Sequence, residues 1–174
     1  LQAWLSVADA MSAITQGLKG LRKEPLYASP PPGGIPGEDD DILIELLAEL
    51  YGLFTGPPAW RQSLLTAFKE LGFKKHPLAP CVALMYEDVG DQKEQLTGVI
   101  VIEADHLLGG GVGDHFHSAV IELERRFKFG KWVELSETAC EYGGRTVKQK
   151  PDYSSYIHGS LLERSCSRDT SRTW

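Results

Sequence analysis

One segment near the middle of the chain constrains the fold more than any other. Gly98–Ile102 is a short apolar run rich in β-branched residues, and it ends directly in the polar group Glu103–His106. β-Branched side chains favour strands, whereas ionised groups beside an apolar run need a cation, a hydrogen-bond network or a substrate to compensate them. We therefore predict a buried strand that turns and carries Asp105 to the edge of a sheet, as a candidate metal or catalytic site. This strand is expected to belong to a hairpin, and glycines 109–111 are predicted to form the turn after that hairpin.

The composition excludes several classes of protein. With 174 residues, 42% of them hydrophobic, the chain can form one domain with a sizeable core or a piece of a larger one. A net charge of −6 argues against a surface that attracts nucleic acid all over, although a local basic cleft is compatible with it. Three widely spaced cysteines indicate neither a disulfide framework nor a zinc site. Because no apolar run approaches a membrane span of about 20 residues and no signal peptide is evident, we expect an intracellular protein, cytoplasmic or nuclear.

Hydrophobic periodicity predicts an α+β fold. Strands are expected at residues 5–10, 81–86, 96–104, 133–140 and 145–150, with a hairpin between the second and the third. Amphipathic helices are expected at residues 59–71 and 114–129. Leucines at helical spacing predict another helix over residues 42–53, although its first three residues could form a strand, and Gly56–Pro58 is expected to stop it. This order favours an antiparallel sheet with two helices packed on one face.

The chain is predicted to divide into one domain and a tail. Residues 1–150 carry all of the predicted elements. Residues 151–174 are rich in Ser and Arg, have no apolar period, and are expected to form a polar, disordered tail. The Pro- and Gly-rich stretch 25–37 is expected to be extended or looped, with a linker between two packed pieces as one interpretation.

Two carboxylates, Asp9 and Asp105, stand at the ends of predicted strands nearly a hundred residues apart in the sequence. Adjacent antiparallel strands would bring them together, and paired carboxylates of this kind assemble two-cation phosphoryl-transfer sites. Their hard oxygens suit Mg²⁺. The alternative is a pair of strand-end carboxylates held by local hydrogen bonds. A second group of residues allows two interpretations, a transition-metal site or a solvated helix start. The group consists of His106, Asp114, His115 and His117.

Several short blocks follow one another between Val7 and Gln149. The first, Asp9–Gly17, has the pattern Asp-x-x-x-Ala-Ile-x-x-Gly. The others are Leu26–Gly33, Leu50–Trp60, Leu71–Lys74 with Pro80–Val82, Glu103–Leu108, and Arg126–Gly144. In this order and spacing they resemble the reverse transcriptase domain of copia-type long-terminal-repeat retrotransposons, which has Tyr-Val-Asp-Asp-Leu-Leu where this chain has Glu-Ala-Asp-His-Leu-Leu.

The resemblance implies a polymerase palm with only part of the fingers and without a thumb or ribonuclease H region. It implies that Asp9 and Asp105 are catalytic and bind Mg²⁺, with an RNA or DNA primer–template as partner. It also implies a nucleotide site at three positions, Ile14, Gly52 and Leu53.

The departures from the family pattern bear on activity. His106 stands where the family has a second adjacent aspartate, so it is a catalytic position with the wrong side chain for Mg²⁺. Ile14 replaces the aromatic residue that such enzymes place under the incoming sugar. Phe54, Thr55 and Pro58 replace Lys, Gln and Arg in the third block.

These observations predict a palm fragment from a copia-type retrotransposon polyprotein. It is an RNA-directed DNA polymerase by descent, whose relatives transfer nucleotides with two metal ions, and it is catalytically degenerate in this chain. The alternative is a co-opted structural or interaction subunit of a larger assembly, with protein partners and the palm as a scaffold. The acidic composition and the altered catalytic block fit that alternative.

Overall fold

The computed structural model of the protein describes residues 3, 5–17, 24–39, 41–90, 93–130, 132–135 and 139–159. The chain forms two compact units. Residues 1–11 and 67–174 make up the first, and residues 12–66 make up the second. Helix α1 (Gly56–Glu70) begins in the second unit, and its last residues belong to the first.

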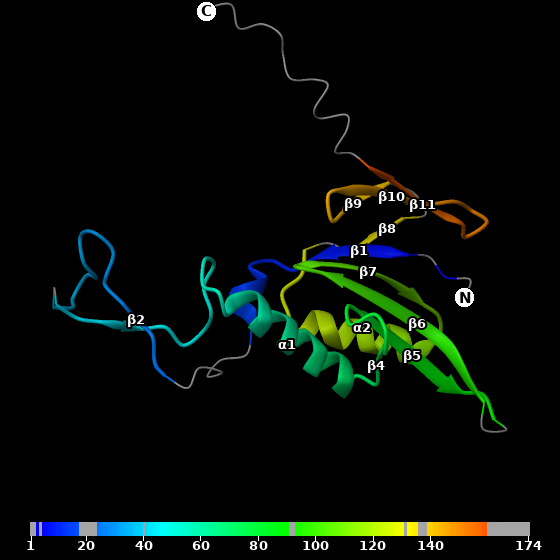
Figure 1. Ribbon diagram of the computed structural model, residues 1–174, viewed down its shortest axis with the longest axis horizontal. Helices are drawn as coiled ribbons and strands as arrows, with labels where there is room; N and C mark the ends of the chain where they lie inside the picture. The colour runs from blue at the N-terminus through cyan, green and yellow to red at the C-terminus, as the bar shows by residue number, and fades with distance from the viewer. Residues whose placement is uncertain are drawn as a thin grey trace, which may run out of the picture. The chain divides into compact units, whose positions relative to one another are not determined.

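An antiparallel sheet of six strands forms the centre of the first unit (Figure 1). The strand order is β4-β5-β6-β7-β1-β8, so the strand nearest the N-terminus lies between two strands from much later in the sequence. The predicted strands near residues 5–10, 81–86 and 96–104, and the hairpin joining the last two, are confirmed. The bounds are β1 (Ser6–Asp9), β4 (Lys74–Lys75), β5 (Val82–Asp88), β6 (Glu94–Glu103), β7 (His106–Gly111) and β8 (Val133–Glu134).

The hairpin between β6 and β7 has a tight turn. Glu103 pairs with His106, so only Ala104 and Asp105 form the turn, and Ala104 takes a left-handed φ of 54°. The prediction that glycines 109–111 form a turn is wrong, because they lie inside β7 and pair with β6. At Gly111, glycine is favoured because a neighbouring ring fills the space that a side chain would occupy.

That ring belongs to Phe116 on α2 (Asp114–Arg126), which covers one face of the sheet. It lies against Gly98 and Gly111, which pair across β6 and β7. Phe116 also contacts Phe73, whose ring is 5.2 Å from that of Phe68 in the last part of α1. Both predicted helices of the α+β fold are therefore confirmed, and both contribute an aromatic side chain to this cluster.

A second, three-stranded sheet contributes to the core on the other side of β1. It contains β9 (Cys140–Tyr142), β10 (Arg145–Gln149) and β11 (Ser155–Gly159) in the order β11-β10-β9. Side chains from this region and from β1 form a buried cluster of Val7, Leu135, Tyr142 and Val147. Residues 133–140 thus do not form the one strand that we predicted, but contribute to two short ones.

The boundary predicted at residue 150 falls between paired strands. All five residues of β11 pair with β10, so the expectation of a disordered tail is wrong for residues 155–159. Residues 155–158 are exposed, so the strand is held by its backbone hydrogen bonds and not by an apolar face. The rest of the predicted tail, residues 160–174, lies outside the described residues.

The second unit contains the 3₁₀ helix η1 (Ala13–Gln16), the start of α1, and a small ladder of β2 (Tyr27–Ala28) with β3 (Ile44–Glu45). The helix predicted over residues 42–53 is absent, whereas the strand alternative at its beginning is correct. Leu43 and Leu47 are 65% and 63% exposed, so the apolar stripe has no core to cover. The predicted stop at Gly56–Pro58 is instead the first turn of α1, where proline lacks only an amide that has no partner there.

Candidate metal site

Two neighbouring strands bring the predicted carboxylates together. β1 and β7 are antiparallel, and their register places Asp9 opposite His106. Asp105 precedes β7 in the two-residue turn. The Ala10 amide donates to the Asp105 carbonyl at 2.8 Å, and the Gly130 amide donates to the Asp9 carbonyl at 2.7 Å, so backbone hydrogen bonds hold both aspartates.

Asp9, Asp105 and His106 form one cluster of possible metal ligands. Each offers a ligand atom, and these atoms lie within 4.8 Å of one another. The Nδ1 atom of His106 is 3.1 Å from the Oδ1 atom of Asp105. Asp9 is exposed, and the side chains of Asp105 and His106 keep 42% and 36% of their surface. The expected meeting of Asp9 and Asp105 is thus observed, while their catalytic and metal-binding roles stay predictions.

The cluster lies on the face of the sheet that turns away from α2. Residues 7 and 9 of β1 share one face because side chains alternate along a strand, and Val7 belongs to the core cluster with Tyr142. The ring of His106 contacts that of Tyr142 edge-on, with 6.4 Å between the centroids. Tyr142 of β9 thus lies beside the imidazole.

Tyr142 was missed by sequence reasoning. Its side chain is 8% exposed, and its hydroxyl has no hydrogen-bond partner among the described residues. Burial, and then the negative charge of Glu103, raise its pKa to about 12. Glu103 itself lies over the next residue, since a Cβ on Gly143 would be 2.7 Å from its Oε1. The position just before a Gly-Gly turn was the one available signal, and it does not reveal which strand the tyrosine contacts.

The other predicted site residues are not part of this cluster. Ile14, Gly52 and Leu53 belong to the second unit, where the side chain of Ile14 lies against Gly56 and the Leu53 amide donates to the Leu50 carbonyl at 3.2 Å. Gly52 has a φ of 91° and is open around its Cα.

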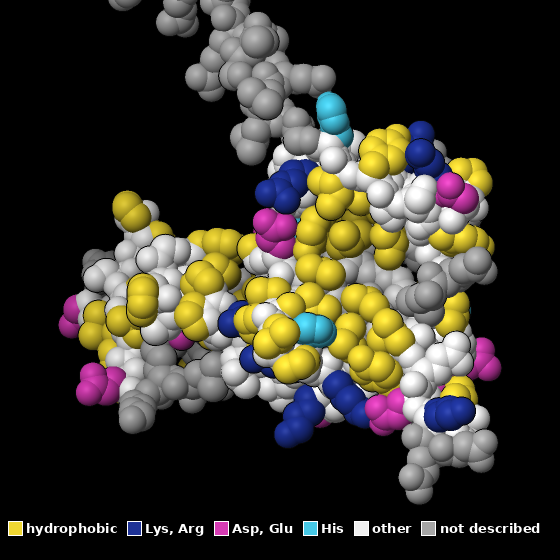
Figure 2. Space-filling model, turned by 45° about the vertical axis from the view of Figure 1, so that its right-hand side comes forward, with side chains coloured by type: hydrophobic (Ala, Val, Ile, Leu, Met, Phe, Trp, Pro, Cys, Tyr) yellow, Lys and Arg dark blue, Asp and Glu magenta, His cyan; other side chains and the backbone are white. Residues whose placement is uncertain are grey.

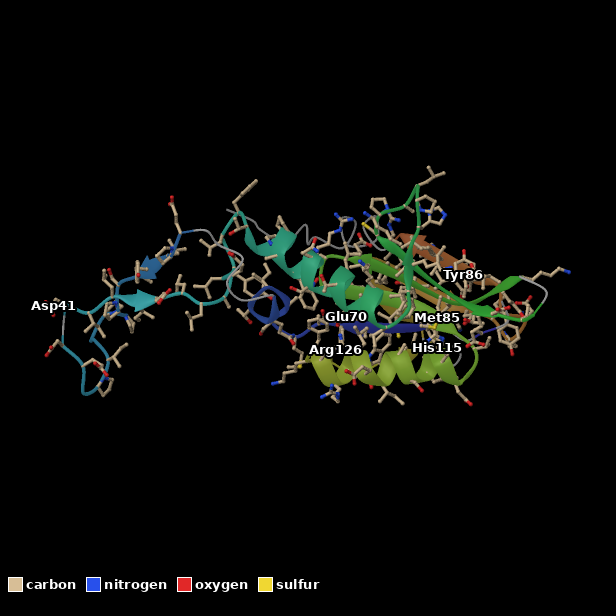
Figure 3. All side chains as sticks on the ribbon, turned by 90° about the horizontal axis from the view of Figure 1, so that it is seen from below. Asp41, Glu70, Met85, Tyr86, His115 and Arg126 are labelled. Atoms are coloured by element: carbon tan, nitrogen blue, oxygen red, sulfur yellow. The ribbon has the colours of Figure 1, made fainter. Side chains whose placement is uncertain are left out.

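The second histidine group considered from the sequence does not assemble with His106. In the part of the chain that is described, only the cluster with Asp9 and Asp105 meets the distance requirement for a metal site. Nδ1 of His115 lies 4.0 Å from Glu87 instead (Figure 3 labels His115).

Basic side chains near the end of α2 are paired with acids. Arg125 and Arg126 both bind Glu122, and Arg126 also reaches Glu70 at the end of α1 (Figure 3). Hydrogen bonds from Arg125 and Arg126 lower the pKa of Glu122 to about 2. On the face of the first unit shown in Figure 2, dark blue side chains stand in separate groups rather than in one stripe. Among the described residues visible on this face, the basic side chains thus form no continuous track for a nucleic acid backbone.

Comparisons with known proteins indicate a retrotransposon connection. Over 66 residues the chain is 32% identical to a putative transposon Ty5-1 protein of Saccharomyces cerevisiae. The match includes 38% of this chain and 21%, about a fifth, of the length of that relative. No family model and no solved structure matches the chain. The similarity is consistent with a retrotransposon origin. As for membranes, none of the helices in the described ranges has the length and apolar character of a membrane span.

Proposed function

We propose that this chain is a palm-like unit of a copia-type RNA-directed DNA polymerase, inherited from a retrotransposon and degenerate in its catalytic site. One observation carries the proposal. Asp9 and Asp105, distant in the sequence, lie together at the end of adjacent antiparallel strands. The similarity to a transposon protein supports the same origin.

The donor set partly fits the Mg²⁺ that such a polymerase uses. Mg²⁺ takes one or two carboxylates from a protein and completes its coordination with water and substrate phosphates. Asp9 and Asp105 would hold it, and both keep access to solvent. Bound there, the ion would supply charge stabilisation and activation of an attacking hydroxyl in phosphoryl transfer.

His106 is the reason that we propose a degenerate site. An imidazole offers nitrogen where the site needs a hard anionic oxygen, and its protonated form would repel the cation. It lies opposite Asp9 in the strand register and contacts Asp105, so it occupies the position where a further carboxylate would act.

The proposed nucleotide positions are altered as well. Ile14 stands where the resembled block has an aromatic residue. Thr55, which replaces a glutamine of the resembled block, donates its hydroxyl to Oε2 of the buried Glu49 at 2.6 Å. That hydroxyl is already used within the second unit.

The test restores the missing acid with His106→Asp. We expect the wild-type chain to extend no primer with Mg²⁺. We expect the variant to bind Mg²⁺–dTTP about tenfold more tightly, since one added ligand worth about 1.4 kcal/mol changes a dissociation constant tenfold. His106→Asn is the matched control, because it has the shape of aspartate without its charge.

Two results would contradict the proposal. If His106→Asp gains no affinity over His106→Asn while its circular dichroism is unchanged, the pair is not a nucleotidyl-transfer site. If Asp9→Asn in the repaired variant leaves Mg²⁺–dTTP binding intact, the gain does not come from this cluster. Primer extension by the wild-type chain would refute the loss of activity.

A further inference from the structure

We infer that Asp9, Asp105 and His106 form a site for a divalent transition-metal ion, with Zn²⁺ bound more tightly than Mg²⁺. The inference rests on the metal-binding pair of the proposed function and needs no nucleotidyl transfer. Here His106 is a ligand that changes which metal ion binds, and not only a residue that replaces a carboxylate.

The separation of two donors matches the coordination sphere of such an ion. Nδ1 of His106 and Oδ1 of Asp105 are 3.1 Å apart. Two donors at about 2.05 Å from Zn²⁺ would subtend about 98° at this separation, between the octahedral and tetrahedral angles. A metal ion can therefore bind where the two groups now face each other.

Asp9 can complete a set of three. Its ligand atom lies within 4.8 Å of the other two, and a tetrahedral edge at Zn²⁺ is about 3.4 Å. The side chain is exposed, so rotation about its own bonds can close the difference without moving β1. Three protein ligands on an open surface leave at least one position for water.

The donor chemistry separates the two metals. Imidazole nitrogen is a common ligand of Zn²⁺ and other transition metals, whereas Mg²⁺ prefers oxygen. With two carboxylates shared by both ions, the affinity difference should come from His106. The edge-on contact with Tyr142 and the hydrogen bonds that hold the backbone of both aspartates limit the rearrangement needed on binding.

The experiment is isothermal titration calorimetry of the full chain with Zn²⁺ and with Mg²⁺. We expect Zn²⁺ to bind at least about tenfold more tightly than Mg²⁺. His106→Ala should remove that advantage and leave Mg²⁺ affinity unchanged, while Asp9→Asn should weaken both ions. His115→Ala is the matched control, because it removes another exposed histidine with a carboxylate neighbour.

A spectroscopic readout locates the ion independently. Nitrogen-15 chemical shifts of the imidazoles should move for His106 on adding Zn²⁺, and the His115 signals should stay in place. If His106→Ala binds Zn²⁺ as tightly as the wild type, this inference is wrong. In that case, loss of Mg²⁺ binding in Asp9→Asn would still support the Asp9–Asp105 metal pair of the proposed function. If neither ion binds, or if Asp9→Asn changes neither affinity, the metal pair of the proposed function fails too.

Discussion

Replacing either glycine beneath Phe116 tests the packing that holds α2 on the sheet. A Cβ on Gly111 would lie 2.6 Å from both Cδ atoms of the Phe116 ring, and one on Gly98 would lie 2.6 Å from its Cε2. Favourable carbon contacts begin near 3.5 Å, so each methyl overlaps the ring by at least about 0.9 Å, and other atoms of the ring are closer still. The ring is 5% exposed and contacts Phe73, so it has little room to move.

We therefore expect Gly111→Ala to lower the free energy of unfolding by about 1–3 kcal/mol, the usual cost of overpacking. With an m-value of about 2 kcal/mol/M in urea, this moves the midpoint by about 0.5–1.5 M. Far-UV circular dichroism during urea titration measures the change. Gly130→Ala is the control, because its Cβ would meet only the Asp9 carbonyl oxygen, at an ordinary 3.5 Å.

A double-mutant cycle with Phe116→Ala tests the cause. The single change at Phe116 should itself cost about 3–5 kcal/mol through the cavity that it leaves. In that background the new methyl has free space, so Gly111→Ala should then cost little, with a coupling energy of about 1–3 kcal/mol. An equal penalty in both backgrounds, or none in the wild type, would refute the argument that the ring excludes a side chain at this position.

Three further changes test single interactions. Arg125 and Arg126 hold the pKa of Glu122 at about 2, below its ordinary 4.5, so the stabilisation is complete above pH 4.5 and is lost as the pH falls toward 2. In Glu122→Gln, the urea midpoint should therefore depend less on pH between 4.5 and about 2 than it does in the wild type. An unchanged pH dependence would contradict the pairing. Tyr142→Phe removes a buried hydroxyl without a partner in the described residues and should raise the free energy of unfolding by about 1 kcal/mol, whereas a lower urea midpoint would contradict this. Gln149→Leu removes the acceptor of the Leu5 amide, at 2.8 Å, and should cost about 1–3 kcal/mol with faster hydrogen exchange at Leu5. Slow exchange there would show that another group satisfies the amide.

Local patterns predicted the elements that bury an apolar stripe or form a hairpin with a neighbour. Periodicity correctly placed three of these elements: the helices near residues 59–71 and 114–129, and the hairpin of β5 and β6. In each, the residues that define the pattern are close in sequence, so the chain itself carries the information.

The segment 42–53 shows where periodicity failed. Its leucines have helical spacing, but an isolated helix of this length gains most of its stability from a surface to pack against. Here the backbone pairs instead with the Tyr27–Ala28 strand, and the Leu46 amide donates to the Leu26 carbonyl at 2.8 Å. The competing partner is about twenty residues away, beyond the reach of a local pattern.

The sequence alone determined that Asp9 and Asp105 each follow an apolar run and that His106 comes directly after Asp105. The tertiary structure decided that β1 pairs with β7, which placed Asp9 opposite His106 and made a cluster of the three. It also decided that Gly111 of β7 lies under an aromatic ring, and that the ring of Tyr142 contacts the imidazole. Strand order and register depend on contacts between distant segments, and these contacts turn three polar residues into a candidate metal site.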